Sequence, residues 1–202
     1  MNKIRMIALA ACMAATLDAS AQEQEIRLFS HRGGRMEHDE NTLSAFQASY
    51  DAGYRGFETD IRMTRDGALV ITHDSSLERT TNGTGTVEEK TEAEIRQLAT
   101  KQGNKMMFLD ELLEFLKGKE GLYVEFEMKT KPEALYPEER LHAYCDKLYD
   151  AVMAVKPADA TFVFTSGDYR GLRYLQAKHP GVDLLLITSC LLYTSDAADE
   201  RS

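Results

Sequence analysis

The chain has 202 residues and a formal net charge of −9 at neutral pH. This length suits a single domain, and the negative charge argues against binding to nucleic acid or to anionic membranes. Beyond its first residues, the sequence has no apolar run long enough to span a bilayer.

The first 21 residues have the pattern of a secretory signal peptide. A positively charged start precedes an apolar run over residues 7–15, which is too short to cross a membrane, and Ala19-Ser20-Ala21 offers small residues for cleavage. We therefore expect residues 1–21 to be removed and the protein to be exported, either to a periplasm or out of the cell. Lipidation at Cys12 is the alternative.

The first part of the mature chain reads as strand, helix, strand and strand. Residues 26–30 predict a short strand, and the helix that follows is capped by residue 41 or 42 and ended by Gly53. Residues 56–63 predict a second strand. A third strand is expected over residues 68–73, after an Asp-Gly turn.

Helices and strands continue to alternate in the second part. Thr91 and Glu94 form the capping-box pattern of one helix, and residues 110–116 predict another. An apolar stripe over residues 141–155 and the run 168–178 predict two more helices. Three further strands are expected at residues 122–128, 161–165 and 182–188.

Repeated strand–helix units predict an α/β fold with a parallel sheet covered by helices. Six strands fit a doubly wound sheet or most of a (β/α)8 TIM-type barrel, and no G-x-G-x-x-G motif supports the former. We expect a partial barrel domain over residues 22–189, with about six of its eight strands. Residues 190–202 do not continue the pattern and are expected to be a non-native tail, the alternative being a genuine terminus.

Polar residues gather where the expected strands end. They are His31 and Arg32 after the first strand, Glu58 and Asp60 on the second, His73 and Asp74 after the third, and Glu125, Glu127 and Lys129 on the fourth. In a parallel barrel this end of the strands holds the active site. Because side chains alternate along a strand, Glu58 and Asp60 share one face, as do the three residues of the fourth strand. Carboxylates without thiols suit Mg²⁺, Ca²⁺ or Mn²⁺.

The remaining polar residues supply proton transfer and positive charge. His31 and His73 can each take or give a proton near neutral pH. Cleavage of a phosphodiester requires both actions, one on the nucleophile and one on the leaving alkoxide. Arg32 and Lys129 can offset phosphate charge, although either can instead pair with a neighbouring carboxylate.

Other acidic residues near these positions have further interpretations. Glu125 shares a face with Glu127 and can replace it as a metal ligand. Asp74 directly follows His73, so strand alternation predicts that it points to the opposite side. The pair at residues 88–89 is expected to be solvated surface charge.

At these positions the chain resembles the glycerophosphodiester phosphodiesterase family. The matching segments are His31-Arg32-Gly33-Gly34, Glu40-Asn41-Thr42, residues 56–60, His73-Asp74, residues 77–83, residues 126–129 and, more weakly, residues 164–166. The resemblance implies a single bound divalent cation, Ca²⁺ or Mg²⁺, held by Glu58, Asp60 and Glu127. It implies that His31 and His73 are the catalytic pair, and that Arg32 and Lys129 bind the phosphate.

The same resemblance implies the reaction, which is hydrolysis of small glycerophosphodiesters to glycerol 3-phosphate and an alcohol. One alternative is a related phospholipid phosphodiesterase or lyase that releases a cyclic phosphate. Another is a non-catalytic barrel that binds phosphate-containing ligands.

Overall fold

A computed structural model describes residues 28–188. The expected signal peptide, the expected tail and Cys190 lie outside this range. The strands are β1 (Phe29–His31), β2 (Gly56–Met63), β3 (Leu69–Ile71), β4 (Tyr123–Met128), β5 (Thr161–Ser166) and β6 (Leu184–Leu186). The helices are α1 (Leu43–Asp51), α2 (Glu92–Ile95), α3 (Leu109–Leu116), α4 (Glu138–Val155) and α5 (Tyr169–Lys178), with short 3-10 helices η1 (Val87–Glu89) and η2 (Glu133–Leu135).

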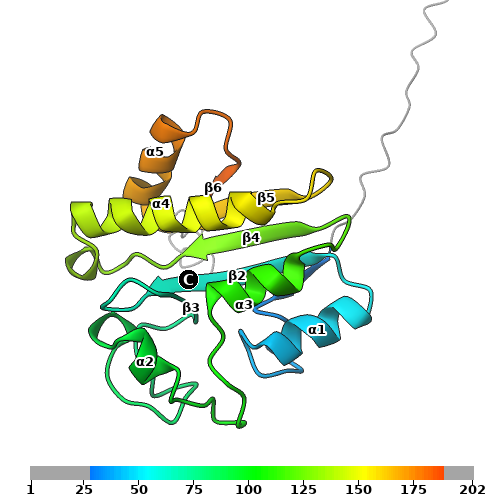
Figure 1. The fold of residues 1–202 in the computed structure, drawn as a ribbon, viewed down its shortest axis with the longest axis vertical. Helices are drawn as coiled ribbons and strands as arrows, with labels where there is room; N and C mark the ends of the chain where they lie inside the picture. The colour runs from blue at the N-terminus through cyan, green and yellow to red at the C-terminus, as the bar shows by residue number, and fades with distance from the viewer. Residues whose placement is uncertain (1–27, 189–202) are drawn as a thin grey trace, which may run out of the picture.

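The described residues form an α/β structure around one sheet. Five strands run parallel in the order β1-β2-β4-β5-β6. Figure 1 shows α3 lying over β2 and α4 lying over β5, beside β4, on the same side of the sheet. Thr42 caps α1 and the Thr91–Glu94 capping box begins α2, both as the sequence predicts. None of the helices in the described part of the chain is long and apolar enough to cross a membrane.

Strand β3 departs from the expected series of strand–helix units. It runs antiparallel to β2, because the turn at Gly67, with φ of 92°, reverses the chain directly. The backbone N–H of Thr72 then donates to the carbonyl of Asp60 at 3.0 Å. This short return strand brings His73 back to the level of the carboxylates on β2.

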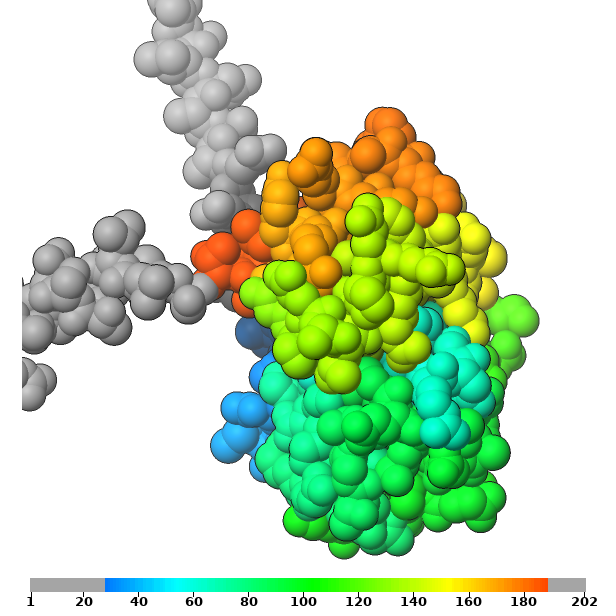
Figure 2. Space-filling model, turned by 90° about the vertical axis from the view of Figure 1, so that its left-hand side faces the viewer, coloured from blue at the N-terminus to red at the C-terminus, as the bar shows by residue number. Residues whose placement is uncertain are grey.

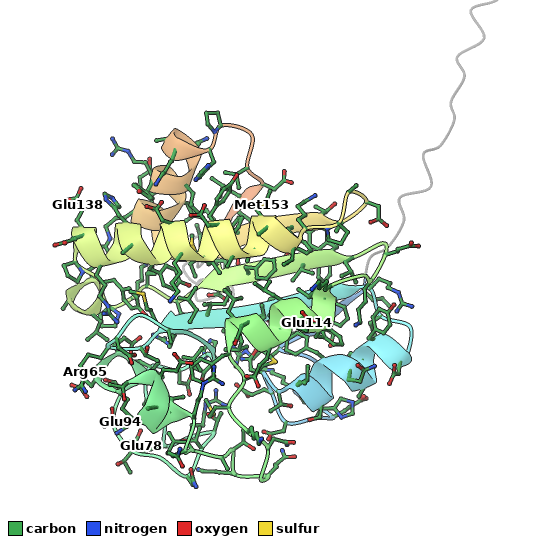
Figure 3. The ribbon with its side chains drawn as sticks, viewed as in Figure 1. Arg65, Glu78, Glu94, Glu114, Glu138 and Met153 are labelled. Atoms are coloured by element: carbon green, nitrogen blue, oxygen red, sulfur yellow. The ribbon has the colours of Figure 1, made fainter. Side chains whose placement is uncertain are left out.

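The core lies between the sheet and its helices. Phe57 and Ile61 of β2 and Phe126 of β4 are fully buried on the helix side. Helix α4 packs its apolar stripe against them, whereas its Glu138 and Met153 point away from the sheet (Figure 3). Alternation along β2 and β4 therefore leaves their acidic residues on the opposite face.

Strand β3 and the segment between β3 and α3 build a second, smaller apolar cluster. Its buried members are Val70, Leu77, Val87, Ile95, Met106 and Phe108. In the space-filling view of Figure 2, this green segment lies directly below the yellow-green residues that open α4. The cluster holds η1 against the end of β2, which places a polar residue of η1 close to the carboxylate face.

Candidate active site

The turn after β1 is built on left-handed backbone. Arg32, Gly33 and Gly34 have φ values of 54°, 75° and 96°, and a Cβ on Gly33 would lie 3.0 Å from the Cβ of Ala45. Only glycine fits such a position at little cost. The turn directs the backbone N–H of Arg32 to the Glu58 carboxylate, 3.1 Å from its Oε2.

Three carboxylates converge beside this turn. Parallel pairing of β2 with β4 sets Asp60 opposite Glu127, with Glu58 two residues earlier on the same face of β2. Each offers an oxygen, and these oxygens all lie within 4.8 Å of one another. Glu125 pairs with Glu58 in the register but is outside this cluster, and its carboxylate accepts a hydrogen bond from Tyr123 at 3.3 Å.

The donor set fits a divalent cation. Glu58 and Asp60 are 9% and 0% exposed, and Oε1 of Glu58 is buried without a hydrogen-bond partner. Burial, followed by the charges of Asp60 and Glu127, raises the pKa of Glu58 to about 8. Such a group needs a proton or a cation, and three oxygen donors suit a hard ion such as Mg²⁺ or Ca²⁺.

Both predicted phosphate-binding residues also contact the carboxylates. Lys129 Nζ lies 2.5 Å from Oε1 of Glu127 and 3.1 Å from Oδ1 of Asp60. Arg32 Nε lies 3.2 Å from Oδ2 of Asp60, and its Nη1 donates to Glu40 at 3.1 Å. Arg32 and Lys129 therefore form the ion pairs with neighbouring carboxylates that the sequence allowed as an alternative to phosphate binding.

His31 borders the cluster at the end of β1. Its Nε2 lies 3.5 Å from Oε2 of Glu58, and its side chain is half exposed. Burial, together with the charges of Arg32 and Arg35, lowers the pKa of His31. The imidazole is therefore mostly uncharged at neutral pH, which is the form that accepts a proton.

His73 is held by the residue that follows it. Its Nδ1 lies 2.6 Å from Oδ1 of Asp74, so the prediction that Asp74 points away was wrong. The chain has already left β3 at this point, and strand alternation no longer applies. Burial opposes ionisation of Asp74, but hydrogen bonds from Arg79 and His73 lower its pKa to about 2. The ionised Asp74 therefore accepts a hydrogen bond from Nδ1–H of His73, and Nε2 of His73 is the ring nitrogen left for proton transfer.

Arg79, Glu40 and Arg32 connect the His73–Asp74 pair to the carboxylates on β2. Arg79 donates from Nη1 and Nη2 to Glu40 at 3.0 and 2.8 Å, and it also bonds to Asp74. Since Glu40 accepts a hydrogen bond from Arg32 as well, and Arg32 contacts Asp60, polar contacts run from His73 to the carboxylate cluster. Glu40 and Arg79 lie in segments that carry the family resemblance, but their mutual contact has no signal in the sequence.

A second polar group lies at the end of β2. Glu88 is only 7% exposed, so the expectation of solvated charge at residues 88–89 was wrong for this residue. Its carboxylate accepts hydrogen bonds from Arg62 at 2.8 Å, Ser75 at 2.6 Å and Tyr136 at 3.1 Å. The apolar cluster around η1 buries Glu88 among these polar side chains, and sequence reasoning had no means to detect that.

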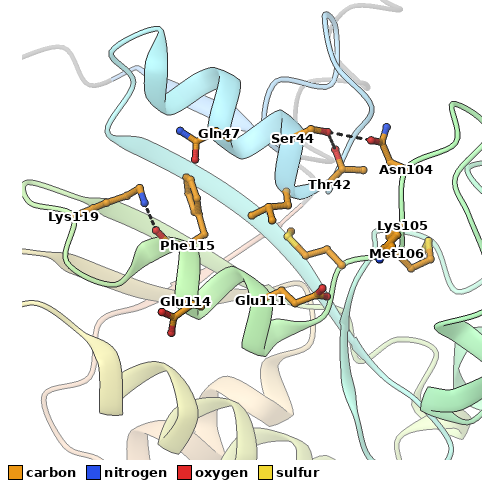
Figure 4. A pocket seen from close by; sticks show the side chains of 12 residues that line it. Thr42, Ser44, Gln47, Asn104, Lys105, Met106, Glu111, Glu114, Phe115 and Lys119 are labelled. Carbon is orange, nitrogen blue, oxygen red and sulfur yellow. Dashed lines mark hydrogen bonds between the residues drawn. The ribbon is translucent and has the colours of Figure 1, made fainter.

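A large pocket elsewhere plays no part in this arrangement. Its volume is about 790 Å³, and it lies between α1, α3 and the loop before α3 (Figure 4). Leu43, Met106, Met107 and Phe115 give it an apolar lining. None of the predicted catalytic or metal-binding residues lines it, so we place the candidate site at the carboxylate cluster instead.

Comparison with known proteins identifies the family of the chain. Residues 31–201 match the model of the glycerophosphoryl diester phosphodiesterase family. Over 174 residues the chain is 30% identical to a glycerophosphodiester phosphodiesterase of Caldanaerobacter subterraneus subsp. tengcongensis, which covers 81% of this chain and 67% of that protein.

Comparison with solved structures gives phosphodiesterases as well. A glycerophosphodiester phosphodiesterase from Agrobacterium tumefaciens aligns with a TM-score of 0.63 and 28% identity, over 78% of this chain and 65% of that one. An Oleispira antarctica phosphodiesterase in complex with the product sn-glycerol-3-phosphate aligns with a TM-score of 0.70 and 25% identity, over 86% and 72%. The chain, with its partial TIM-type barrel, belongs to the glycerophosphoryl diester phosphodiesterase family of phosphoric diester hydrolases.

Proposed function

We propose that His31 and His73 act as an acid–base pair in the hydrolysis of glycerophosphodiesters to glycerol 3-phosphate and an alcohol. The observation that carries this proposal is the convergence of three carboxylates within 4.8 Å of one another, with His31 3.5 Å from Glu58 and His73 just after β3, the strand paired with β2. The uncharged His31 suits removal of a proton from the nucleophile. His73 would protonate the leaving alkoxide in its doubly protonated form, with the Nδ1 proton hydrogen-bonded to Asp74 and the transferred proton on Nε2.

We further propose that Glu58, Asp60 and Glu127 hold one divalent cation, Ca²⁺ or Mg²⁺. When bound, such an ion polarises a phosphoryl oxygen and lowers the pKa of a nearby hydroxyl or water. Lys129 bridges Asp60 and Glu127, so its ammonium group stands where a phosphate held at the cation would meet it. Arg32 supplies further positive charge from the turn after β1.

Release of glycerol 3-phosphate from glycerophosphocholine tests the function directly. We expect turnover with Ca²⁺ or Mg²⁺ and none after treatment with a chelator, because the substrate phosphate would lose the cation that binds it. Phosphorus NMR of the products separates direct hydrolysis from release of a cyclic phosphate. Binding of glycerophosphocholine without any turnover in the presence of either cation would contradict the proposal and favour a binding protein.

Cation binding should also change how stability depends on pH. Since the folded pKa of Glu58 is about 8 and its ordinary value is 4.5, its protonation stabilises the cation-free protein fully below the ordinary value. This contribution is lost as the pH rises through about 8. We expect added cation to compensate, with a stabilisation of about 2.7 kcal/mol at one hundred times Kd, or roughly 5–11 °C in Tm.

The rise in Tm caused by the cation should be larger above the folded pKa of Glu58 than near its ordinary value, because protons compete with the cation for the carboxylate. Thermal unfolding with and without Mg²⁺ or Ca²⁺ at both pH values measures this difference. The Glu58→Gln variant is the control, and it should show little cation effect at either pH. An equal effect in the variant would exclude Glu58 as a ligand.

A further inference from the structure

Arg62 occupies a special position on β2. It lies two residues beyond Asp60 on the same face of the strand, and it is only 7% exposed. Its Nε donates to the backbone carbonyl of His73 at 2.9 Å, and its Nη1 lies 3.3 Å from the backbone carbonyl of Lys129. One guanidinium therefore contacts the backbones of a candidate acid–base residue and a candidate phosphate-binding residue.

The guanidinium of Arg62 is held in place by the carboxylate of Glu88. Nη1 donates to Oε1 of Glu88 at 2.8 Å, and that oxygen also accepts a hydrogen bond from the Tyr136 hydroxyl at 3.1 Å. The other oxygen of Glu88 accepts from Ser75, two residues after His73. The Arg62–Glu88 pair thus ties together the end of β2, the loop after β3 and the end of β4.

We propose that Arg62 and Glu88 are positioning residues for catalysis, setting the places of His73 and Lys129 relative to the carboxylate cluster. This inference rests on the proposed function of those two residues. Arg62 reaches the two carbonyls because its planar group presents donors in a fixed fork. A lysine at this position keeps the charge beside Glu88 but has a single donor atom, so it cannot hold both carbonyls in the same geometry.

The chain provides a matched control for a purely structural role. Arg140 of α4 also donates to two backbone carbonyls, those of Met63 and Thr64, each at 2.9 Å. These carbonyls lie at the same end of β2 as Arg62, but Arg140 contacts neither His73 nor Lys129. Arg140→Lys therefore perturbs backbone contacts at the same end of β2 as Arg62→Lys does, and only Arg62→Lys affects the proposed catalytic residues.

We expect Arg62→Lys to lower kcat for glycerophosphocholine by roughly 10- to 100-fold, since small displacements of catalytic groups have effects of this size. Arg140→Lys should keep kcat near the wild-type value. Calorimetric titration with Mg²⁺ or Ca²⁺ should give the same Kd in all three proteins, because Arg62 does not contact the carboxylate cluster. Wild-type kcat in Arg62→Lys, or equal losses of kcat in both variants, would overturn the proposal.

Amide hydrogen exchange on the full chain provides a readout that does not depend on turnover. Exchange at residues 73–75 and 129–130 should be faster in Arg62→Lys than in Arg140→Lys or the wild type. Unchanged exchange there would overturn the inference even if the wild type hydrolyses its substrate. If the wild type hydrolyses no glycerophosphodiester, the proposed function fails, and hydrogen exchange still decides whether Arg62 positions these two segments.

Discussion

Replacement of His31 or His73 by alanine in the full chain is expected to lower kcat by about 10²- to 10⁴-fold, the usual contribution of a general acid or base. Neither change should unfold the protein, because His31 is half exposed and His73 about one third exposed in their side chains. Steady-state kinetics with glycerophosphocholine, together with circular dichroism spectra, measures both effects.

The control is His142→Ala. This histidine stacks on Tyr174 at 3.9 Å between ring centroids, on α4 and away from the carboxylates, so its loss should leave kcat unchanged. Near-normal turnover in either the His31 or the His73 variant would reject the acid–base assignment of that residue. A similar loss in all three variants would point to a general effect of histidine replacement on the fold.

Glu127→Gln is expected to abolish tight cation binding and to lower kcat/KM by roughly 10³-fold, equivalent to several kcal/mol of transition-state stabilisation. The reason is that the amide has the same shape but cannot supply a charged oxygen to the site. Isothermal titration with Mg²⁺ and Ca²⁺ measures the first effect, and the glycerophosphocholine assay measures the second.

Glu125→Gln provides the matched comparison, because Glu125 and Glu127 share one strand, one face and one residue type. The structure excludes Glu125 from the cluster of Glu58, Asp60 and Glu127, so this variant should bind the cation as the wild type does. Cation binding that survives in Glu127→Gln and is lost in Glu125→Gln would reverse the assignment of the third ligand.

Much of the fold could be predicted because local patterns determine it. The apolar and acidic alternation of residues 56–63 and 122–128 predicts β2 and β4, and the apolar stripe of α4 predicts a helix buried on one side. The same alternation places Glu58, Asp60 and Glu127 on one face. Their convergence additionally requires β2 and β4 to be neighbours in a set register, and the parallel arrangement met that condition.

The contacts that could not be predicted depend on loops and on residues distant in the sequence. The direction of β3 follows from the turn at Gly67, and its periodicity is the same in either orientation. Asp74 lies beyond the strand, so alternation gave the wrong side for it. The buried Glu88 pairs with Arg62, which lies 26 residues earlier in the chain, and no local pattern encodes such a pairing.

The pairing of β2 with β4 also bears on how faithfully this sheet assembles. If the two strands slipped by one residue, acidic side chains would face the apolar layer that contains Phe57 and Phe126, at a high cost in desolvation. A slip by two residues would keep the faces and would set Asp60 opposite Glu125 in place of Glu127. A cation that binds these carboxylates during folding would therefore favour the native alignment over the one-residue slip, so the residues proposed for chemistry would also help the sheet to assemble with its acidic face intact.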